Sequence, residues 1–409
     1  MSFWSNKPLK LNSGLKNDNT YILDSDSLLL NINTEISNSK FSLDYYIVTS
    51  PDDFLKTQLL EFINNNYNGI DSKFTLNYSK ELFNHYITPD TLCILFYPYN
   101  KKPSNISTQN MVGFICGHPE IIYIKENNTF KQYKTIDVNY LCLIKSIRNL
   151  HFSSYMINIL TKRCLLKFNK QINCALYTIG GKPIKTPSFS NKTFYHRPIN
   201  VENLTDSKLL LLDKDICVLK QMFQTFDFDK NFLKNYKFIH LTKRYLDKNQ
   251  DVLTNIVNEI HDKLFYINQI NYDIFDYKSK HDIRNILLND SFYNFLIINP
   301  ETNEIKDFIC LYNLITKNTI NNISSRNGYF YIFMTLENDT YKFNLIEYIS
   351  KYSFENDLFD MITVMDIMEN GYLKDKHFKI LNSSTKLYYY MYNLQLSQIE
   401  PFKNGLITI

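Results

Sequence analysis

An asparagine inside an apolar stretch is the first candidate for chemistry in this sequence. Asn139 lies within residues 137–145, a run that otherwise favours a buried strand. A buried amide must find hydrogen-bond partners or cost about 1–3 kcal/mol. A polar turn at residues 146–151 and then a helix follow, and backbone N–H groups at a helix N-terminus bind phosphate well. The pattern therefore fits a phosphate-binding site or an ordinary buried strand, and spacing alone does not decide.

The C-terminus is the second candidate. Residues 405–409 (Gly-Leu-Ile-Thr-Ile) are apolar and typical of a strand, whereas most chain ends fray in solvent. We therefore expect another part of the molecule to bury this end. Burial would raise the pKa of the terminal carboxyl group above its usual value of about 3.5.

The elements around Asn139 follow from short apolar runs and turn signals. Two successive hairpins are expected, and a helix is predicted at residues 152–168, where apolar side chains recur on one face. A further strand is predicted at residues 174–177. The hairpin strands are predicted at residues 92–97, 111–116, 121–124 and 136–144.

The second half of the chain repeats this order. Residues 307–310 (Asp-Phe-Ile-Cys) echo residues 113–116 (Gly-Phe-Ile-Cys), and each set closes a predicted hairpin. The elements of the second half are predicted as strands at 294–298, 308–314, 329–336 and 361–368 and a helix at 343–352. Such an echo predicts two copies of one α/β unit. We place them at residues 1–226 and 227–409.

Composition restricts the class of protein. With 409 residues, 44% hydrophobic residues and 15% aromatic residues, the chain can bury two cores. The net charge is only +4 and the basic residues are scattered, which argues against a nucleic-acid partner. Seven cysteines without a Cys-x-x-Cys pair indicate reduced core residues. Neither a signal peptide nor a transmembrane run of roughly 18 apolar residues is found, so we expect a cytoplasmic protein.

A series of motifs resembles the N-myristoyltransferase family, in the same order along the chain. Residues 137–145 (Asp-Val-Asn-Tyr-Leu-Cys-Leu-Ile-Lys) are similar to the family signature Glu-Ile/Val-Asn-Phe-Leu-Cys-x-His-Lys. Weaker matches are Phe3-Trp4, residues 78–81 (Tyr-Ser-Lys-Glu), 112–115 (Val-Gly-Phe-Ile), 177–180 (Tyr-Thr-Ile-Gly), 194–197 (Phe-Tyr-His-Arg) and 366–370 (Asp-Ile-Met-Glu-Asn). Their common order from Phe3 to Ile409 carries the resemblance.

The resemblance implies a fold and a reaction. The fold is of mixed α/β class, with two fused acetyltransferase-like (GNAT-type) units, pseudo-twofold symmetry and a continuous central sheet. The first unit would hold the acyl-CoA and the second most of the peptide. The reaction is transfer of a myristoyl or similar long fatty acyl group from myristoyl-CoA to the N-terminal glycine of a protein, with no metal or other cofactor. A monomer is expected. An inactive acyl-CoA or peptide-binding relative, or an acyltransferase with another chain length or amine acceptor, stays open.

Catalytic roles are implied for five residues. In the family the terminal carboxylate, here that of Ile409, is the general base. The backbone amides of Tyr140 and Leu141 would form an oxyanion hole, and Asn139 and Thr178 would hold the glycine amine. A free carboxyl is about 4 pH units too acidic to match an α-amine, and burial would narrow that gap.

Binding roles are implied for two further sets. The acyl-CoA set is Phe3, Trp4, Tyr140, Leu141, Cys142, Leu143, Arg148, Asn149, His151, Phe152 and Ser153. The peptide set is Tyr78, Asp71, Phe194 and His196. From the residue types alone, Thr178 also fits a capped strand edge and His196 a structural hydrogen bond.

The resemblance is weakest at the charged loops. The family's phosphate loop Arg-Ser-Lys-Arg becomes Arg-Asn-Leu-His at residues 148–151, which leaves one certain cation. A glycine-rich loop with an aspartate has no counterpart at residues 377–386, and an acidic run shrinks to Asp71. We therefore expect weak discrimination for lysine within the peptide.

Overall fold

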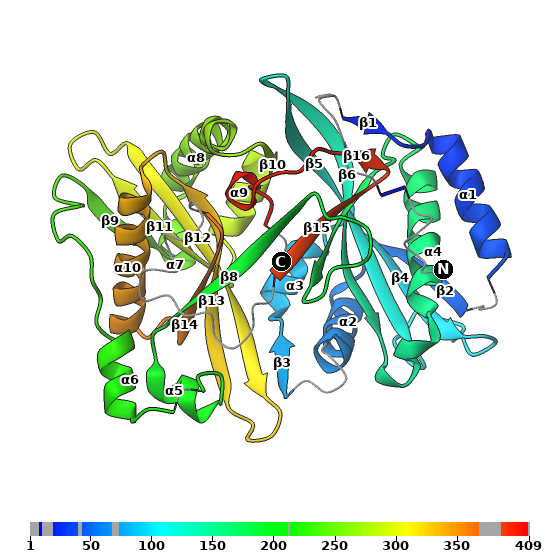
Figure 1. Ribbon diagram of the computed structural model, residues 1–409, viewed down its shortest axis with the longest axis horizontal. Coiled ribbons are helices and arrows are strands. Elements are labelled where there is room, and N and C mark those ends of the chain that lie inside the picture. Colours follow the sequence, from blue (N-terminus) through cyan, green and yellow to red (C-terminus); the bar gives the residue numbers. More distant parts are fainter. Residues whose placement is uncertain are drawn as a thin grey trace.

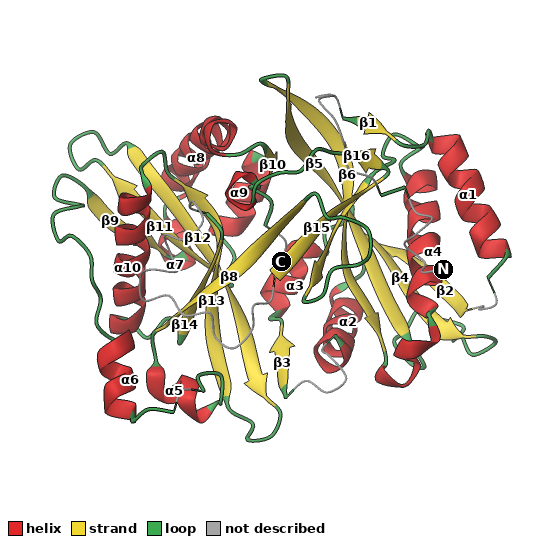
Figure 2. Cartoon of the chain, in the orientation of Figure 1, coloured by secondary structure: helices red, strands yellow, loops and turns green. Residues whose placement is uncertain are grey.

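The computed structural model describes residues 8–9, 19–39, 43–67, 73–211, 213–367 and 386–407, apart from the side chain of Asn149. Figure 1 shows two halves side by side, with the strands of the first half at the right and those of the second half at the left. Strands β8 (Ser190–Pro198) and β15 (Lys386–Tyr392) cross the centre between them. Figure 2 shows helices beside the strands of both halves.

The two halves have the same order of elements. The first comprises β2 (Leu43–Thr49), α2 (Asp53–Asn66), β3 (Phe74–Asn77), α3 (Lys80–Tyr86), β4 (Leu92–Pro98), β5 (Gly113–Glu126), β6 (Thr129–Leu143), α4 (Phe152–Lys167) and β7 (Ala175–Gly180). The second comprises β9 (Lys237–Leu241), α8 (Gln250–Asn271), β10 (Ile274–Asp276), α9 (Lys280–Leu287), β11 (Phe292–Ile298), β12 (Ile305–Asn318), β13 (Ser324–Met334), α10 (Asp339–Glu355) and β14 (Met361–Met365). Helix α7 (Lys243–Lys248) of the second half has no counterpart in this comparison.

The remaining elements join or flank the two halves. They are β1 (Thr20–Tyr21), α1 (Ser25–Ser37), the 3₁₀ helix η2 (Lys145–Leu150), α5 (Val201–Asp206), α6 (Ile216–Phe223), β16 (Leu394–Gln395) and the 3₁₀ helix η3 (Pro401–Lys403).

The central sheet is nearly a palindrome of equivalent strands. Its order is β2-β4-β5-β6-β7-β15-β8-β14-β13-β12-β11-β9. Within the halves, β6–β7 and β13–β14 are the equivalent parallel pairs. This continuous sheet, built from two α/β units, confirms the predicted fold class. The sequence echo lies at equivalent places, on β5 and on β12.

Local sequence accounts for the helices. Helix α8 places Leu253, Val257, Ile260, Leu264 and Ile267 on one buried face, at the spacing of an amphipathic helix. In α4 the buried face carries Met156, Ile159, Leu160 and Cys164. Side chains cap the N-termini of α2, α3 and α9, the last with a complete capping box.

Three sequence predictions are corrected. The strands predicted at 111–116 and 121–124 are one strand, β5, because β6 pairs with it along nearly its whole length. In the described part of the C-terminus, residues 405–407 form no strand, and only Asn404 makes an isolated bridge, with Ile274. Six of the cysteines are buried and all seven are free, but Cys217 is exposed rather than in the core.

Within the described residues, no helix combines the length and apolar character that crossing a membrane requires.

Candidate active site

The parallel strands β6 and β7 separate at the centre of the first half. They pair only at Ile136 with Ala175 and at Asp137 with Leu176. Asn139 and Thr178 each lie two residues beyond the last pair. Because strand side chains alternate with a period of two, these two residues lie on the same side of the sheet, across the opening between the strands. Two of the predicted catalytic residues are thus placed opposite one another.

A β-bulge occurs in β6 at the same point. Phe114 of β5 pairs with Cys142 of β6, and Cys116 of β5 pairs with Asn139 of β6. Tyr140 and Leu141 of β6 therefore face only the one β5 residue between Phe114 and Cys116. Tyr140 has a positive φ of 51°, which is unusual for a bulky residue. Its N–H donates to Oδ1 of Asn139 at 2.8 Å. One of the two expected oxyanion donors is therefore bound to the neighbouring side chain.

The side chain of Tyr140 lies in a cage of aromatic rings. It is fully buried, and the centroids of four rings lie 5.3–5.8 Å from its own. Among the described residues, its hydroxyl has no hydrogen-bond partner. The four rings are those of Tyr67, Tyr78, Phe83 and Tyr86. The predicted peptide residue Tyr78 is thus brought next to the predicted catalytic strand.

The turn after β6 leads from the 3₁₀ helix η2 into α4. Arg148 donates through Nε to the carbonyl of Leu143 at 2.9 Å and through a second nitrogen to the carbonyl of Asn66. The predicted phosphate cation is therefore directed toward the main chain. His151 is exposed, has a φ of 60°, and is the N-cap residue of α4, which its side chain does not cap. Such a helix end offers N–H donors to an anion.

The other described members of the acyl-CoA set lie nearby in the chain. Leu141 is 37% exposed, whereas Cys142 and Leu143 are buried. Burial raises the pKa of the Cys142 thiol to about 12, so it remains protonated at neutral pH. Phe152 and Ser153 are partly buried in the first turn of α4.

Thr178 is linked to the C-terminal segment through one tyrosine. On β15, Tyr389 pairs with Thr178 of β7 and with Ser190 of β8. Residues paired in this way point to the same side of a sheet. The hydroxyl of Tyr389 donates to the carbonyl of Leu406 at 3.1 Å. Leu406 is therefore anchored on the face of the sheet that carries Thr178.

In the part of the C-terminal segment that the structure describes, Leu406 is buried, and Gly405 and Ile407 are partly buried. Leu406 is 1% exposed, and its N–H donates to Oδ1 of Asn404 at 3.0 Å. Gly405 donates its N–H to the carbonyl of Ile274 at 2.7 Å. The segment is thus held against β10, although without strand pairing.

The predicted peptide residues Phe194 and His196 lie on β8. Their rings stack, with centroids 6.4 Å apart and an interplanar angle of 14°. Nδ1 of His196 is 2.9 Å from Oγ1 of Thr363, its register partner on β14. Burial lowers the pKa of His196 to about 4. The expected structural hydrogen bond of His196 is present, and this geometry leaves a peptide-binding role as a proposal.

A cluster of buried and partly buried carboxyl groups lies around Lys278 where the halves meet. Lys278 forms ion pairs with Asp276 and with Glu120, the latter at 3.6 Å. The hydroxyl of Tyr86 donates to Oδ2 of Asp137 at 2.9 Å. Burial raises the pKa of Glu120 to about 8 and that of Asp137 to about 6, while nearby carboxylates raise the pKa of Lys278. Burial thus opposes ionisation of Glu120 and Asp137, and the charge of Lys278 acts against this effect.

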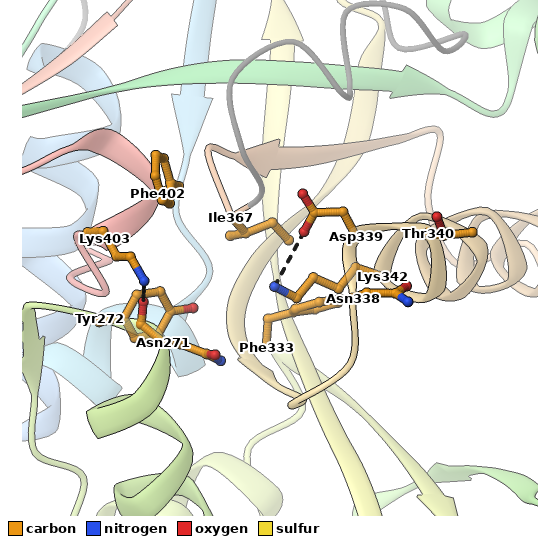
Figure 3. A pocket seen from close by; sticks show the side chains of 10 residues that line it. All are labelled: Asn271, Tyr272, Phe333, Asn338, Asp339, Thr340, Lys342, Ile367, Phe402 and Lys403. Atoms are coloured by element: carbon orange, nitrogen blue, oxygen red, sulfur yellow. Dashed lines mark hydrogen bonds and ion pairs between the residues drawn. The ribbon is translucent and has the colours of Figure 1, made fainter.

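Two adjoining cavities lead toward this cluster. The larger, of about 550 Å³, is shown in Figure 3, with Lys403 bonded to the carbonyl of Asn271 and Lys342 paired with Asp339. It shares Tyr272 and Phe333 with a smaller cavity. The smaller one is lined also by Asp276, Lys278, Gly405 and Ile407. Open space therefore reaches the C-terminal segment from the second half.

Several predicted positions lie outside the described residues. They are Phe3, Trp4, Asp71, Ile409, the side chain of Asn149 and the loop at residues 368–385. Among the described residues, no cluster of three or more His, Cys, Asp or Glu side chains could hold a metal ion.

Sequence reasoning missed Tyr389, Lys192 and Lys278. Each has a partner more than ten residues away in the chain, although Lys278 also pairs with the nearby Asp276. A signal existed for Lys192 alone, as a lysine beside the Phe-Tyr-His-Arg motif within a strand.

Known proteins match the chain over this site. A sequence model of the family described as "Myristoyl-CoA:protein N-myristoyltransferase, N-terminal domain" matches residues 22–188, which include Asn139 and Thr178. Glycylpeptide N-tetradecanoyltransferase of Plasmodium falciparum (isolate 3D7) is 27% identical over 364 residues, covering 87% of this chain and 80% of that protein. Glycylpeptide N-tetradecanoyltransferase 1 of Arabidopsis thaliana is 23% identical over 375 residues, covering 87% and 77%.

The fold has a solved counterpart. A crystal structure of Saccharomyces cerevisiae N-myristoyltransferase with bound myristoyl-CoA superposes with a TM-score of 0.74 and 19% identity, covering 100% of this chain and 93% of that one. At 19% identity, this structural similarity is evidence for a shared fold alone. Together with the sequence matches across the separated strands and the bulge, it leads to one conclusion: the chain belongs to the N-myristoyltransferase family.

Proposed function

We propose that this protein transfers a myristoyl group from myristoyl-CoA to the N-terminal glycine amine of other proteins. One observation carries the proposal. Asn139 and Thr178 face each other across the opening between β6 and β7, and the C-terminal segment is anchored beside Thr178 through Tyr389. Relatives named glycylpeptide N-tetradecanoyltransferase match over 87% of the chain and supply the substrate classes.

The opening between the strands suits the thioester end of acyl-CoA. Beyond Asp137 and Leu176, the described parts of β6 and β7 share no further paired residues. A thioester placed there would have its carbonyl close to the backbone of Tyr140 and Leu141. The N-terminus of α4 is suited to the phosphates of the coenzyme, with Ser153 in its first turn.

The chemical step is a direct acyl transfer. The glycine nitrogen attacks the thioester carbonyl carbon, a C–N bond forms, and the C–S bond breaks to release coenzyme A as its thiol. The glycine ammonium group first loses one proton to the carboxylate of Ile409, whose burial would raise its basicity toward that of the amine. The second proton that the nitrogen loses on acylation passes to the departing thiolate. No covalent enzyme intermediate is required.

Asn139 would couple binding of the amine to stabilisation of the oxyanion. In the free protein its Oδ1 accepts the N–H of Tyr140. An incoming amine would offer its own N–H to the same oxygen, which would release the N–H of Tyr140 for the developing oxyanion. A donor of this kind commonly contributes about 2.7–4 kcal/mol to the transition state.

The test crosses acyl-CoA chain lengths with peptide N-termini. Mass spectrometry of the peptide and assay of free thiol should show one myristoyl group added and one thiol released for each glycine peptide. Peptides that begin with alanine or with acetylated glycine should not react. Equal reaction of all three would refute the glycine assignment, and no thiol with any acyl-CoA would indicate an inactive binding protein.

A further inference from the structure

Two buried side chains hold one main-chain carbonyl close to the end of the chain. Nζ of Lys192, on β8, donates to the carbonyl of Leu406 at 3.1 Å. The hydroxyl of Tyr389, on β15, donates to the same carbonyl, also at 3.1 Å. Lys192 is 1% exposed and Tyr389 is fully buried. Since a carbonyl has two lone pairs, the two donors satisfy it completely.

The rest of the segment is fixed by its own contacts. The N–H of Leu406 and that of Gly405 are bound by Asn404 Oδ1 and by the carbonyl of Ile274. A Cβ at Gly405 would lie 2.6 Å from the ring of Tyr272, so the chain passes as close to that ring as glycine allows. Residues 404–406 thus have little freedom of position or direction.

Lys192 is not part of an ion pair among the described residues. Its one hydrogen-bond acceptor there is the carbonyl of Leu406. Burial lowers the pKa of Lys192 to about 7, although Asp366 and Asp276 act against this change. Burial of a lysine without an ion-pair partner lowers the stability of the fold. The contact of Lys192 with the terminal segment is therefore not explained by a stabilising salt bridge.

We propose that Lys192 and Tyr389 are positioning residues that hold the Leu406 carbonyl and so direct the terminal carboxylate toward the amine. The inference rests on the proposed function, because the carboxylate matters only if it accepts the proton. Neither side chain reacts. Loss of either donor should leave acyl-CoA bound normally while the base is misplaced, and a misplaced base lowers kcat.

The chain offers a matched control for the tyrosine. Tyr390 is 1% exposed, and its hydroxyl accepts the N–H of Ile184 at 3.2 Å. It points to the opposite side of β15, and within the described part of the chain its hydroxyl makes no hydrogen bond to the terminal segment. Tyr389→Phe and Tyr390→Phe therefore each remove one buried hydroxyl and create no cavity in the core.

We expect Tyr389→Phe to lower kcat at least tenfold, with the dissociation constant of myristoyl-CoA changed less than twofold. Tyr390→Phe should retain at least half of the wild-type kcat. Lys192→Met, which keeps the length of the side chain and removes the donor, should repeat the Tyr389→Phe result. Thermal unfolding of each variant separates this effect from loss of folded protein. Equal losses in the two tyrosine variants would overturn the proposal.

A truncated enzyme without Thr408 and Ile409 completes the experiment. If Tyr389 acts through the terminus, Tyr389→Phe should change the residual rate of the truncated enzyme less than twofold. If the loss of kcat in the combined variant instead equals the product of the losses from truncation and from Tyr389→Phe, the positioning role is overturned. A truncated enzyme as active as the full chain would overturn both the carboxylate base and the positioning role. If truncation lowers kcat strongly and Tyr389→Phe does not lower it, only the positioning role is overturned.

Discussion

Tyr140 has a backbone conformation that its surroundings impose. A φ of 51° costs a bulky residue about 1–3 kcal/mol. The surrounding rings hold the side chain, and Asn139 Oδ1 binds the backbone N–H at 2.8 Å. Packing in the first half therefore offsets the strain of this backbone conformation.

The tyrosine hydroxyls in this cage should differ in their contribution to stability. That of Tyr140 has no partner among the described residues, so Tyr140→Phe should raise the free energy of unfolding by about 1 kcal/mol. That of Tyr86 donates to Asp137, so Tyr86→Phe should lower it by about 1–3 kcal/mol. Urea unfolding of both variants measures the difference. A loss in Tyr140→Phe as large as that in Tyr86→Phe would contradict this account.

His196 should make stability depend on pH. Its pKa is lowered to about 4 by burial, whereas an unfolded histidine titrates near 6.5. Between pH 6.5 and pH 4 the histidine binds a proton in the unfolded state but not in the folded state. The stability that the neutral, buried His196 contributes is therefore present above pH 6.5 and is lost as the pH decreases. The stability advantage of the wild type over His196→Gln should therefore shrink by about 2 kcal/mol between pH 7.5 and pH 5. Replacing the exposed His281 by Gln provides the control, and an unchanged gap for His196→Gln would refute the prediction.

At the scale of elements, each half lends a short strand to the other. Strand β3 of the first half pairs with the far end of β12, and β10 of the second half pairs with the far end of β5. Both lent strands come directly before equivalent helices, α3 and α9. This exchange places β10 beside the first half. Ile274, whose carbonyl binds Gly405, lies in this strand, and Lys278 follows the strand in the chain.

Lys278 should be essential to this junction. Lys278→Met would leave Asp276 and Glu120 buried without their cation, at a cost of about 3–5 kcal/mol in unfolding free energy. Adding Glu120→Gln should recover part of the loss, because it removes one uncompensated carboxyl. Lys220→Met, which breaks an exposed pair with Glu202, should cost less than about 1 kcal/mol and serves as the control. Equal losses in the two methionine variants would refute the prediction.

Local pattern could predict the elements but not their pairing. The apolar spacing of residues 152–168 predicted α4 closely, and an amide in an apolar run marked Asn139 as unusual. The bulge and the separation of β6 from β7 depend on register with distant strands, which no short window contains. The same holds for β15, which lies between β7 and β8 although some two hundred residues separate it from both. The links from Tyr389 and Lys192 to Leu406 arise only from that placement.

At the scale of the whole molecule, the symmetry of the sheet does not make the halves independent. The boundary predicted between residues 226 and 227 would leave β10 and β15 in the second piece. In the first piece, β5 would then lose its partner β10, and β7 would lose its partner β15. The second piece would lose β3 from β12 and β8 from β14. Exposed edges of this kind promote association rather than independent folding.

We therefore expect the full chain to unfold in one cooperative transition. The calorimetric and van't Hoff enthalpies should agree, because the exchanged strands and the Lys278 cluster couple the two cores. Residues 1–226 and 227–409 produced separately should show no cooperative melting, whereas the two produced together should associate and recover a folded complex. Acyl-CoA binding by the complex, but not by either piece, would report that the opening between β6 and β7 forms only when β15 is present. Two resolved transitions in the full chain, or a cooperatively folded first piece, would show that each unit is stable alone and that the lent strands contribute little.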